Sequence, residues 1–201
     1  MDFNFLDNSL KNYFEILSAK TPIPGGGSVT ALCASLSSCL LNMVLNYTIG
    51  KKKYSKFEEE LTKIKEKNEA ILKECVNFIE EDSRIYENID KAIKEKLNPE
   101  DYLKKSVNLH FKICQFMSQI IDFCDILTEK GNINLISDTG ISNILAISSF
   151  NSAKMNILIN LKYINDENFK KEIKDKIEEM ERLVKEKSEI VNRKVIEKMG
   201  V

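Results

Sequence analysis

Apolar residues recur every three or four positions along almost the whole 201-residue chain, and alternation with a period of two is nearly absent. An amphipathic helix needs the first pattern to turn one apolar face toward a core, whereas a half-buried strand needs the second. The sequence therefore predicts an all-α fold. Because 43% of the residues are hydrophobic and no internal repeat occurs, we expect residues 1–201 to form a single-domain helical bundle.

Helix-breaking residues divide this pattern into about six segments. The breaks are rich in Gly, Pro, Asn and Asp, and they predict helices over residues 3–20, 27–49, 55–96, 100–130, 138–164 and 166–199. The second of these helices carries no charge from residue 29 to residue 49 and is long enough to span a membrane. Because Ser, Asn and Thr dilute that stretch heavily, we interpret it as a buried helix of the bundle.

Charge and composition exclude several functional classes. The 30 basic and 31 acidic residues balance, so the chain as a whole has no attraction for nucleic acid or for an anionic membrane. The five cysteines, odd in number and without CxxC spacing, are typical of buried reduced thiols in a cytoplasmic protein. The single histidine, His110, argues against a His-based zinc site and a Ser-His-Asp triad. We therefore expect no metal, and chemistry by carboxylates, lysines and backbone groups.

The loop before the second helix contains Pro24, Gly25, Gly26, Gly27 and Ser28. Three consecutive glycines leave the backbone bare where the next helix exposes its unpaired N–H groups. A carboxylate or a phosphate is the ligand that fits such a position. A P-loop nucleotide site is disfavoured, because the loop lacks the Lys-Ser/Thr pair and no strand precedes it.

The third predicted helix carries one stripe at helical spacing, in which Asp82 occupies a position suited to a buried side chain. The stripe consists of Asn68, Leu72, Cys75, Ile79, Asp82, Tyr86, Ile89 and Ile93. Burying a carboxylate is costly unless it is paired, or unless its pKa rises until it is protonated. A pKa raised toward neutrality suits a general acid or base. The alternative is a structural aspartate that is paired with a lysine of a neighbouring helix.

Two further stripes consist of small residues, which let helix backbones approach closely. They are Ser28, Ala31, Ser35, Ser38 and Asn42 in the second helix, and Ser142, Ala146, Ser149, Ala153, Asn156 and Asn160 in the fifth. We expect these helices to pack together along the two stripes, within one chain or across a dimer. Such packing would bring the glycine loop and Asp138 into one region. On residue type alone, Ser137 and Asp138 also suit a helix N-cap and first turn.

Lys51, Lys52 and Lys53 form the compact basic cluster of the chain. Such a cluster is either a solvated turn or an anion-binding site. It lies about 30 Å from the glycines along one predicted helix, so the two cannot share a small ligand within one subunit. A symmetric antiparallel dimer would bring the lysines of one subunit to the glycines of the other.

Six short blocks follow one another in an order and spacing that resemble one enzyme family. The blocks are TPIPGGGSV at residues 21–29, TIGKKKY at 48–54, EEDSRIY at 80–86, GN at 131–132, SD at 137–138 and NILINL at 156–161. Together they resemble the formimidoyltetrahydrofolate cyclodeaminase family over nearly the whole chain. The resemblance implies an all-helical homodimer that acts on a tetrahydrofolate substrate without a further cofactor.

By this resemblance Asp82 falls on the catalytic aspartate of the family. The reaction implied is conversion of 5-formimidoyltetrahydrofolate to 5,10-methenyltetrahydrofolate with loss of ammonia, and a separate formiminotransferase would supply the substrate. Related members are methenyltetrahydrofolate cyclohydrolases, which hydrate the methenyl bridge to 10-formyltetrahydrofolate. The sequence does not separate the two activities, and a non-catalytic folate-binding helical protein is the third interpretation.

The other blocks suggest binding roles toward the same substrate. Residues 24–28 would hold a carboxylate of the glutamate tail or a polar edge of the pterin, and residues 51–53 would attract the tail carboxylates. Asp138 would accept hydrogen bonds from the pterin amino group and ring N–H. Asn156 and Asn160 would orient the substrate, or would join two helices by hydrogen bonds. The segment 88–106 and the residues around His110 depart from the family pattern.

Overall fold

A computed structural model describes residues 5–200, and within that range every regular element is helical. The elements are α1 Leu10–Ser18, α2 Gly26–Asn46, the 3₁₀ helix η1 Lys52–Phe57, α3 Glu58–Lys94, α4 Glu100–Lys130, the 3₁₀ helix η2 Ile133–Leu135, α5 Ile136–Leu161 and α6 Glu167–Met199. The prediction of an all-α chain with about six helices is confirmed. The dimer and the single-domain boundary stay predictions.

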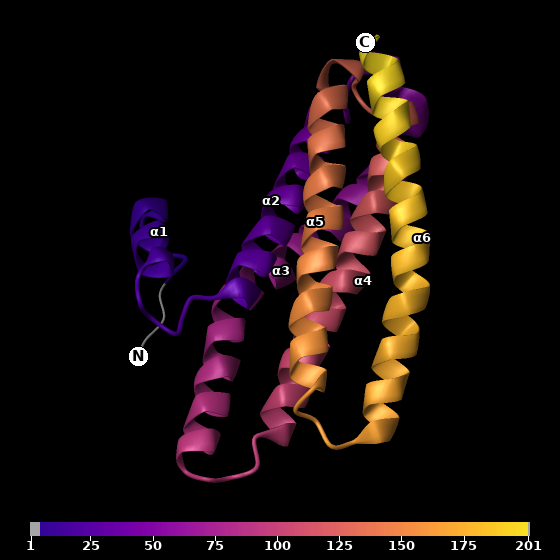
Figure 1. Cartoon of the computed structure of the whole chain (residues 1–201). Helices are drawn as coiled ribbons and strands as arrows, with labels where there is room; N and C mark the ends of the chain where they lie inside the picture. The colour runs from indigo at the N-terminus through magenta and orange to yellow at the C-terminus, as the bar shows by residue number, and fades with distance from the viewer. Residues whose placement is uncertain (1–4, 201) are drawn as a thin grey trace.

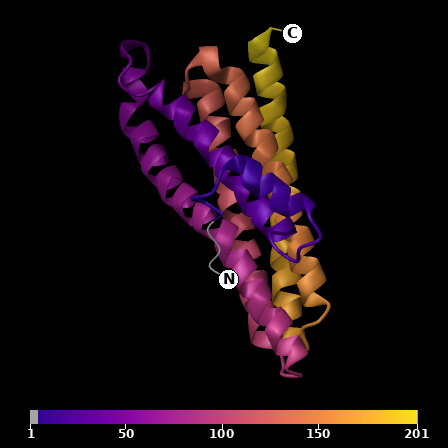
Figure 2. The same ribbon diagram turned by 90° about the vertical axis from the view of Figure 1, so that its left-hand side faces the viewer.

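The first helix is shorter than the sequence pattern predicts. The predicted start at Phe3 lies outside the described residues, and the residues described before Leu10 form turns. The helix begins after Ser9, whose hydroxyl accepts a hydrogen bond from the backbone N–H of Asn12 at 3.1 Å. Polar residues before Leu10 therefore cap the helix rather than extend it. Figure 1 shows α1 beside the bundle, and Figure 2 shows it in front of the middle of the bundle.

The turn between α2 and α3 is longer than predicted. The pattern predicts one helix that ends at residue 49 and another that begins at residue 55, but α2 ends at Asn46 and α3 begins at Glu58. After α2 ends, residues 47–50 form a turn, and its last residue, Gly50, has a φ of 80°, in the left-handed region that favours glycine. The buried Tyr54 then accepts a hydrogen bond from the backbone N–H of Ile133 at 3.2 Å, which ties this turn to η2.

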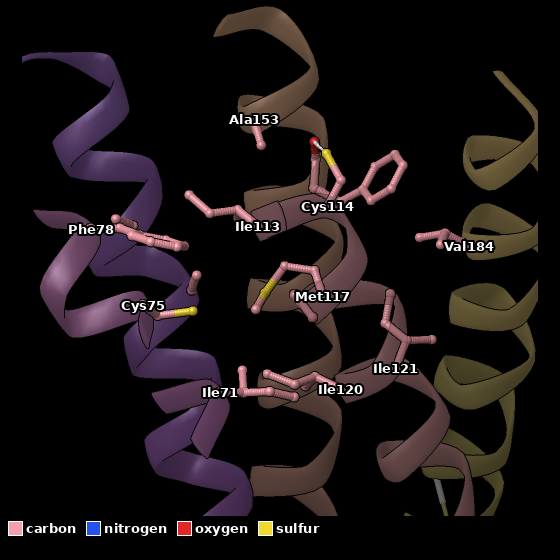
Figure 3. Packing of buried hydrophobic residues seen from close by; sticks show 14 of the residues in the cluster. Ile71, Cys75, Phe78, Ile113, Cys114, Met117, Ile120, Ile121, Ala153 and Val184 are labelled. Carbon is pink, nitrogen blue, oxygen red and sulfur yellow. Dashed lines mark hydrogen bonds between the residues drawn. The ribbon is translucent and has the colours of Figure 1, made fainter. Parts of the chain in front are cut away.

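Helix α4 lies at the centre of the bundle and contacts α2, α3, α5 and α6. Its inward side chains, such as Ile113 and Met117, are fully buried. Figure 3 shows Met117 of α4 pointing toward α3, and both Met117 and Cys75 of α3 belong to the buried core. Of the five cysteines, Cys75, Cys114 and Cys124 are buried, and burial raises the pKa of each thiol to about 12. The expectation of burial is wrong for Cys39, which is exposed.

Helix α2 is long and apolar enough to cross a membrane, judged by length and composition alone, and 61% of its most apolar stretch is buried within the bundle. Its polar side chains find partners on neighbouring helices. The amide of Asn68 in α3 donates to Ser38 O at 2.9 Å and to Asn42 Oδ1 at 2.8 Å, and Ser38 Oγ donates to Asn68 Oδ1 at 2.8 Å. Asn68 is fully buried, so these bonds satisfy a polar group that water does not reach.

Helices α2 and α5 pack together within the chain, as the small residues predict, but along a different face of α2. Ser37 and Ser142 each donate a hydroxyl hydrogen bond to the backbone carbonyl of the other, at 2.7 and 2.8 Å. The predicted α2 stripe is wrong at Ser38 and Asn42, which face α3 instead. The reason is that α2 lies between α3 and α5, so it needs small residues on two faces.

The start of α2 lies part of the way along the bundle (Figure 1). With 21 residues, α2 is about 30 Å long, whereas the 37 residues of α3 span about 55 Å. Both helices have one end at the η1 turn. Beyond Gly26, therefore, α3 continues together with α4 and α5, and α2 no longer fills the space between them.

Candidate functional site

A pocket of about 330 Å³ opens where α2 begins. Its lining comes from the loop before α2 and from α2, α3, α4 and α5: Pro22, Ile23, Gly25, Gly26, Gly27, Asp82, Tyr86, Ile89, Ser106, His110, Asn156, Ile159 and Asn160. The pocket brings together the predicted glycines, the predicted aspartate and both predicted asparagines. These residues are far apart in sequence. Because α2 begins only part of the way along the bundle (Figure 1), it leaves room for them to meet.

The carboxylate of Asp82 lies directly against the backbone of Gly27. A Cβ atom placed on Gly27 would lie 2.0 Å from Asp82 Oδ1, a distance at which no side chain fits. The glycine is thus required by close approach, and its φ is not positive. Because Gly27 is in the first turn of α2, the carboxylate lies at the positive end of the helix dipole.

Three effects act on the pKa of Asp82. Its side chain is only 15% exposed, and burial raises the pKa of the carboxyl above its usual value. The charge of His110 and a backbone hydrogen bond from Ser28 oppose that rise, because both favour the ionised form. The net result is a raised pKa, so the Asp82 carboxyl takes up a proton at a higher pH than a surface aspartate does, as an acid/base group requires.

His110 of α4 is the residue of the site that sequence reasoning missed. Its Nε2 atom lies 3.5 Å from Asp82 Oδ1, and its side chain is 1% exposed. Its other ring nitrogen, Nδ1, is 2.8 Å from the backbone carbonyl of Ser106. Burial lowers the pKa of the imidazole, while Asp82 and the Ser106 carbonyl raise it. The prediction that carboxylates, lysines and backbone alone form the site therefore leaves out the imidazole of His110.

A sequence signal for His110 does exist. Asp82 lies 12 residues before the end of α3 at Lys94, and His110 lies 10 residues after the start of α4 at Glu100, on two successive helices. Successive helices joined by a short turn pack antiparallel, so residues equally far from the turn face one another. A lone histidine is too few for a zinc site or a triad, but one histidine is enough for a pair with a carboxylate across the hairpin.

Ser28 and Pro24 lie behind the pocket wall. Both are buried and neither lines the pocket. The hydroxyl of Ser28 is 3.0 Å from the hydroxyl of Tyr13 in α1, and the two share a hydrogen bond. Burial raises the pKa of Tyr13, and the nearby Asp82 raises it further. The Ser28 hydroxyl thus anchors α1, while its backbone N–H serves the carboxylate.

The two predicted asparagines line the pocket and also join helices. Asn160 donates its amide to Ser106 Oγ at 2.9 Å, and Asn156 donates to Thr30 Oγ1 at 3.3 Å. Both interpretations offered by the sequence therefore have a structural basis. Neither asparagine carries a charge, so the α5 wall of the pocket is polar but neutral.

The lysines and Asp138 lie at the other end of α2. The backbone N–H of Asn132 donates to Thr48 Oγ1 at 3.0 Å, so the start of α5 meets the end of α2 and the two helices run antiparallel. The expectation that their packing brings Asp138 beside the glycine loop is wrong for this reason. Lys51, Lys52 and Lys53 are exposed and also lie outside the pocket. Their binding role stays a prediction.

Within residues 5–200, no group of three or more His, Cys, Asp or Glu side chains is arranged to hold a metal ion. The ionisable groups that line the pocket are Asp82, Tyr86 and His110. Asp82 and His110 form a close pair, which is suited to holding and transferring a proton next to a bound molecule.

Comparison with known proteins gives concordant matches. Residues 9–179 match a family model described as formiminotransferase-cyclodeaminase. The crystal structure of formiminotetrahydrofolate cyclodeaminase from Thermotoga maritima has a TM-score of 0.90 and 30% sequence identity, and the match covers 96% of this chain and 98% of that chain.

Two curated relatives carry different activities in their names. Methenyltetrahydrofolate cyclohydrolase from Methylorubrum extorquens is 29% identical over 191 residues, which cover 90% of each chain. Formimidoyltransferase-cyclodeaminase from Mus musculus is 26% identical over 185 residues, which cover 87% of this chain and 34% of that protein. The chain therefore spans about a third of the length of the mouse relative.

Proposed function

Because this chain belongs to the formiminotransferase-cyclodeaminase family, we propose that it is an enzyme that converts 5-formimidoyltetrahydrofolate to 5,10-methenyltetrahydrofolate and ammonia. The observation that carries the proposal is the buried Asp82 carboxyl, held against the start of α2 and beside His110 in an open pocket. The formiminotetrahydrofolate cyclodeaminase from Thermotoga maritima matches nearly the full length of this chain, and its name supports the same reaction.

The proposed reaction needs one group that first accepts and then donates a proton. N10 of the folate attacks the carbon of the protonated formimidoyl group, whose C=N electron pair moves to the exocyclic nitrogen. The new C–N10 bond leaves N10 with a proton to lose. Asp82 takes that proton as a general base. The tetrahedral carbon then bears an exocyclic amino group, which leaves only as ammonia. Asp82 returns the proton to this nitrogen, the C–N bond breaks, and the carbon forms the methenyl bridge between N5 and N10.

The pocket wall supplies neutral polar groups to hold the folate. Gly25 and Gly26 present bare backbone at the start of α2, where unpaired N–H groups attract a carboxylate or a carbonyl oxygen. Asn156 and Asn160 present amide oxygens on the opposite wall. This arrangement holds the substrate without placing a second charge against Asp82, so it leaves the acid/base balance to the Asp82–His110 pair.

We propose further that the enzyme is a homodimer that forms through one exposed apolar surface, called here the α2–α5 face. It consists of Val29, Leu36, Tyr47, Ile141, Ile144, Met155 and Leu158, each at least 37% exposed. Those of α5 are separated by three, eleven and three residues, which at 3.6 residues per turn places them on one side of the helix. An exposed apolar stripe over two adjacent helices is typical of a protein interface.

Such a dimer gives the lysines and Asp138 a role. Both lie at the end of the α2–α5 pair that is opposite to the pocket, about 30 Å away along α2. A two-fold axis across the α2–α5 face would run the two copies antiparallel and bring the partner's Lys51 and the partner's Asp138 to the pocket. Lysines there would attract the glutamate tail, and Asp138 would accept from the pterin.

We also propose that no cofactor other than the folate substrate takes part, since each step above is a proton transfer or a bond change within the substrate. A separate formimidoyltransferase would supply that substrate, in line with the joined activities in the name of the mouse relative. A cytoplasmic location is supported by the five free cysteines, which are typical of a reducing compartment.

The second candidate function is that of a methenyltetrahydrofolate cyclohydrolase. The Methylorubrum extorquens relative of that name, which matches 90% of both chains, favours it. Hydration of the methenyl bridge also passes through a tetrahedral carbon beside N5 and N10. The same carboxyl would take a proton from the attacking water and return it to N5 as the ring opens.

Two assays on the purified protein separate the candidates. A cyclodeaminase releases ammonia from 5-formimidoyltetrahydrofolate and raises the methenyl absorbance, whereas a cyclohydrolase lowers the absorbance of 5,10-methenyltetrahydrofolate. We expect ammonia release at a rate above that of methenyl loss. Faster methenyl loss without ammonia release would favour the cyclohydrolase. Binding of tetrahydrofolate without turnover of either compound would contradict an enzymatic role.

A further inference from the structure

We propose that His110 and Asp82 share one proton, and that His110 is thereby a positioning residue for the acid/base role of Asp82. The proton sharing stands on the geometry of the two side chains. Its part in turnover rests on the proposed function. The two claims are therefore tested separately.

The hydrogen bond at Nδ1 fixes the tautomer of His110. Its partner is the backbone carbonyl of Ser106 at 2.8 Å, and a carbonyl oxygen only accepts, so Nδ1 carries a hydrogen. The other nitrogen, Nε2, is buried and has no hydrogen-bond partner within residues 5–200. Its near neighbour is Asp82 Oδ1 at 3.5 Å. A proton between these two atoms would give Nε2 the partner that it lacks.

The Asp82–His110 pair is most stable when it holds one proton. With no proton, the Nε2 lone pair would face an ionised carboxylate. With two, a buried imidazolium would face a neutral carboxyl and lack a counter-ion, which is costly. With one, the pair is either a carboxyl that donates to Nε2 or an imidazolium that donates to the carboxylate. Both forms pair the buried groups, and they differ only in the position of the proton.

Among residues 5–200, no other charged side chain lines the pocket and competes for that proton. The α2 wall has backbone and α5 has the neutral Asn156 and Asn160, while Tyr86 of α3 is the remaining ionisable lining residue. Tyr13 of α1 lies outside the pocket lining, where it shares a hydrogen bond with Ser28, and burial and the charge of Asp82 raise the pKa of its phenol. Burial raises the pKa of Asp82 and lowers that of His110, so the two pKa values are brought toward each other. Sharing a proton is the expected behaviour of such a pair.

The position of the proton decides whether Asp82 is ready to act. When it is on Nε2, Asp82 is ionised and can accept the N10 proton of the substrate. When it is on Oδ1, the carboxyl is already protonated and cannot act as a base. During turnover Asp82 gains one proton from N10 and gives one to the departing nitrogen, and His110 keeps its own throughout. The proton count of the pair is the same at the start and at the end.

Nuclear magnetic resonance tests the sharing directly, because the chain contains one histidine. With ¹⁵N-labelled histidine, every imidazole signal belongs to His110. We expect the Nε2 signal of the parent protein to titrate at a pH at least about one unit higher than that of Asp82→Asn, because the variant lacks the carboxylate that stabilises the imidazolium. Equal titration midpoints in the two proteins would overturn the proposal.

The pH dependence of turnover tests the positioning role. His110→Gln keeps a polar side chain of similar size but removes the positive partner of Asp82, so the pKa of the carboxyl rises. The acid limb of kcat/KM should therefore move to higher pH, with KM changed less than kcat. Cys114→Ala is the control, since Cys114 is buried in the same helix and lies outside the pocket. Its acid limb should stay in place.

The two arms have different consequences. A uniform fall in kcat/KM of His110→Gln, with an unmoved acid limb, would overturn the positioning role. If the parent protein turned over neither folate, the proposed function would fail, while the resonance measurement would still decide whether the proton is shared.

Discussion

At the residue scale, the contact between Gly27 and Asp82 defines the site. Sequence reasoning singled out the glycine loop from its composition and Asp82 from its place in a stripe, as two separate features. The contact between them was not predictable, because it depends on where α2 begins relative to α3. The same is true of His110, whose role appears only once the α3–α4 hairpin sets its register.

Gly27→Ala should displace the Asp82 carboxylate, because the new Cβ would lie 2.0 Å from Oδ1. We expect a loss of about 1–3 kcal/mol in the free energy of unfolding and a fall in kcat of at least about tenfold. Urea denaturation and the folate assay measure these effects. Gly26→Ala is the folding control, since its Cβ meets nothing nearer than Asn156 Oδ1 at 3.7 Å. Equal stability of the two variants would contradict the close contact.

Asp82→Asn should also change how stability depends on pH. The pKa of His110 is lowered in the folded state, so its contribution is present above the unfolded value of about 6.5 and is lost as pH falls. In the parent, the raised pKa of Asp82 means that this carboxyl takes up its proton at a higher pH in the folded state than in the unfolded chain, which offsets part of that loss.

Without this offset, the variant should lose about 1–2 kcal/mol more than the parent between about pH 7 and pH 5. Urea denaturation at both pH values measures the difference. The double variant Asp82→Asn, His110→Gln should remove most of it, since neither group then titrates. Parallel stability curves for the parent and the single variant would show that the two groups are not coupled.

At the scale of elements, the helices were predictable and their contact faces were only partly so. Periodicity predicted each long helix, because burial of one face leaves a direct mark on sequence. The helix ends near η1 and before Leu10 differ from the predicted ones, because these ends depend on a capping side chain and on a 3₁₀ turn. The α2 face was assigned wrongly, since small residues mark close packing without naming the partner helix.

Asn68→Ala should destabilise the α2–α3 contact. Asn68 is fully buried, and its loss would remove the amide that donates to Ser38 O and to Asn42 Oδ1. We expect a cost of about 2–4 kcal/mol in the free energy of unfolding, measured by urea denaturation. Asn77→Ala, an exposed change on the same helix, should cost less than about 1 kcal/mol. Similar costs for the two variants would argue against this polar contact as a major source of stability.

At the scale of the whole molecule, the pocket occupies one end of the α2–α5 pair, while the lysines and Asp138 occupy the other. Within one chain, the lysines and Asp138 are too far from the pocket to bind the same small substrate as the pocket residues. The exposed α2–α5 face offers an explanation, because an antiparallel dimer would join opposite ends. Sequence reasoning reached this arrangement from the length of one helix, and it stays a prediction.

Met155→Glu should convert the dimer to a monomer. Met155 is 70% exposed on the α2–α5 face, and a carboxylate there would be buried against its apolar partner. Light scattering after gel filtration measures the mass, which should fall from about twice the 23.1 kDa of the chain to that value. Leu183→Glu is the control, since Leu183 is 54% exposed on α6, away from this face. A monomeric parent protein would contradict the dimer.

The central claim is that the Asp82 carboxyl carries the proton in a folate reaction. The direct measurement is the rate of ammonia release from 5-formimidoyltetrahydrofolate by the parent protein and by Asp82→Asn, with folding of both checked by circular dichroism. We predict ammonia release by the parent and a fall in kcat of about 10²–10⁴-fold in the variant, because an amide neither accepts nor returns the proton. Equal rates for the folded parent and variant would contradict the claim.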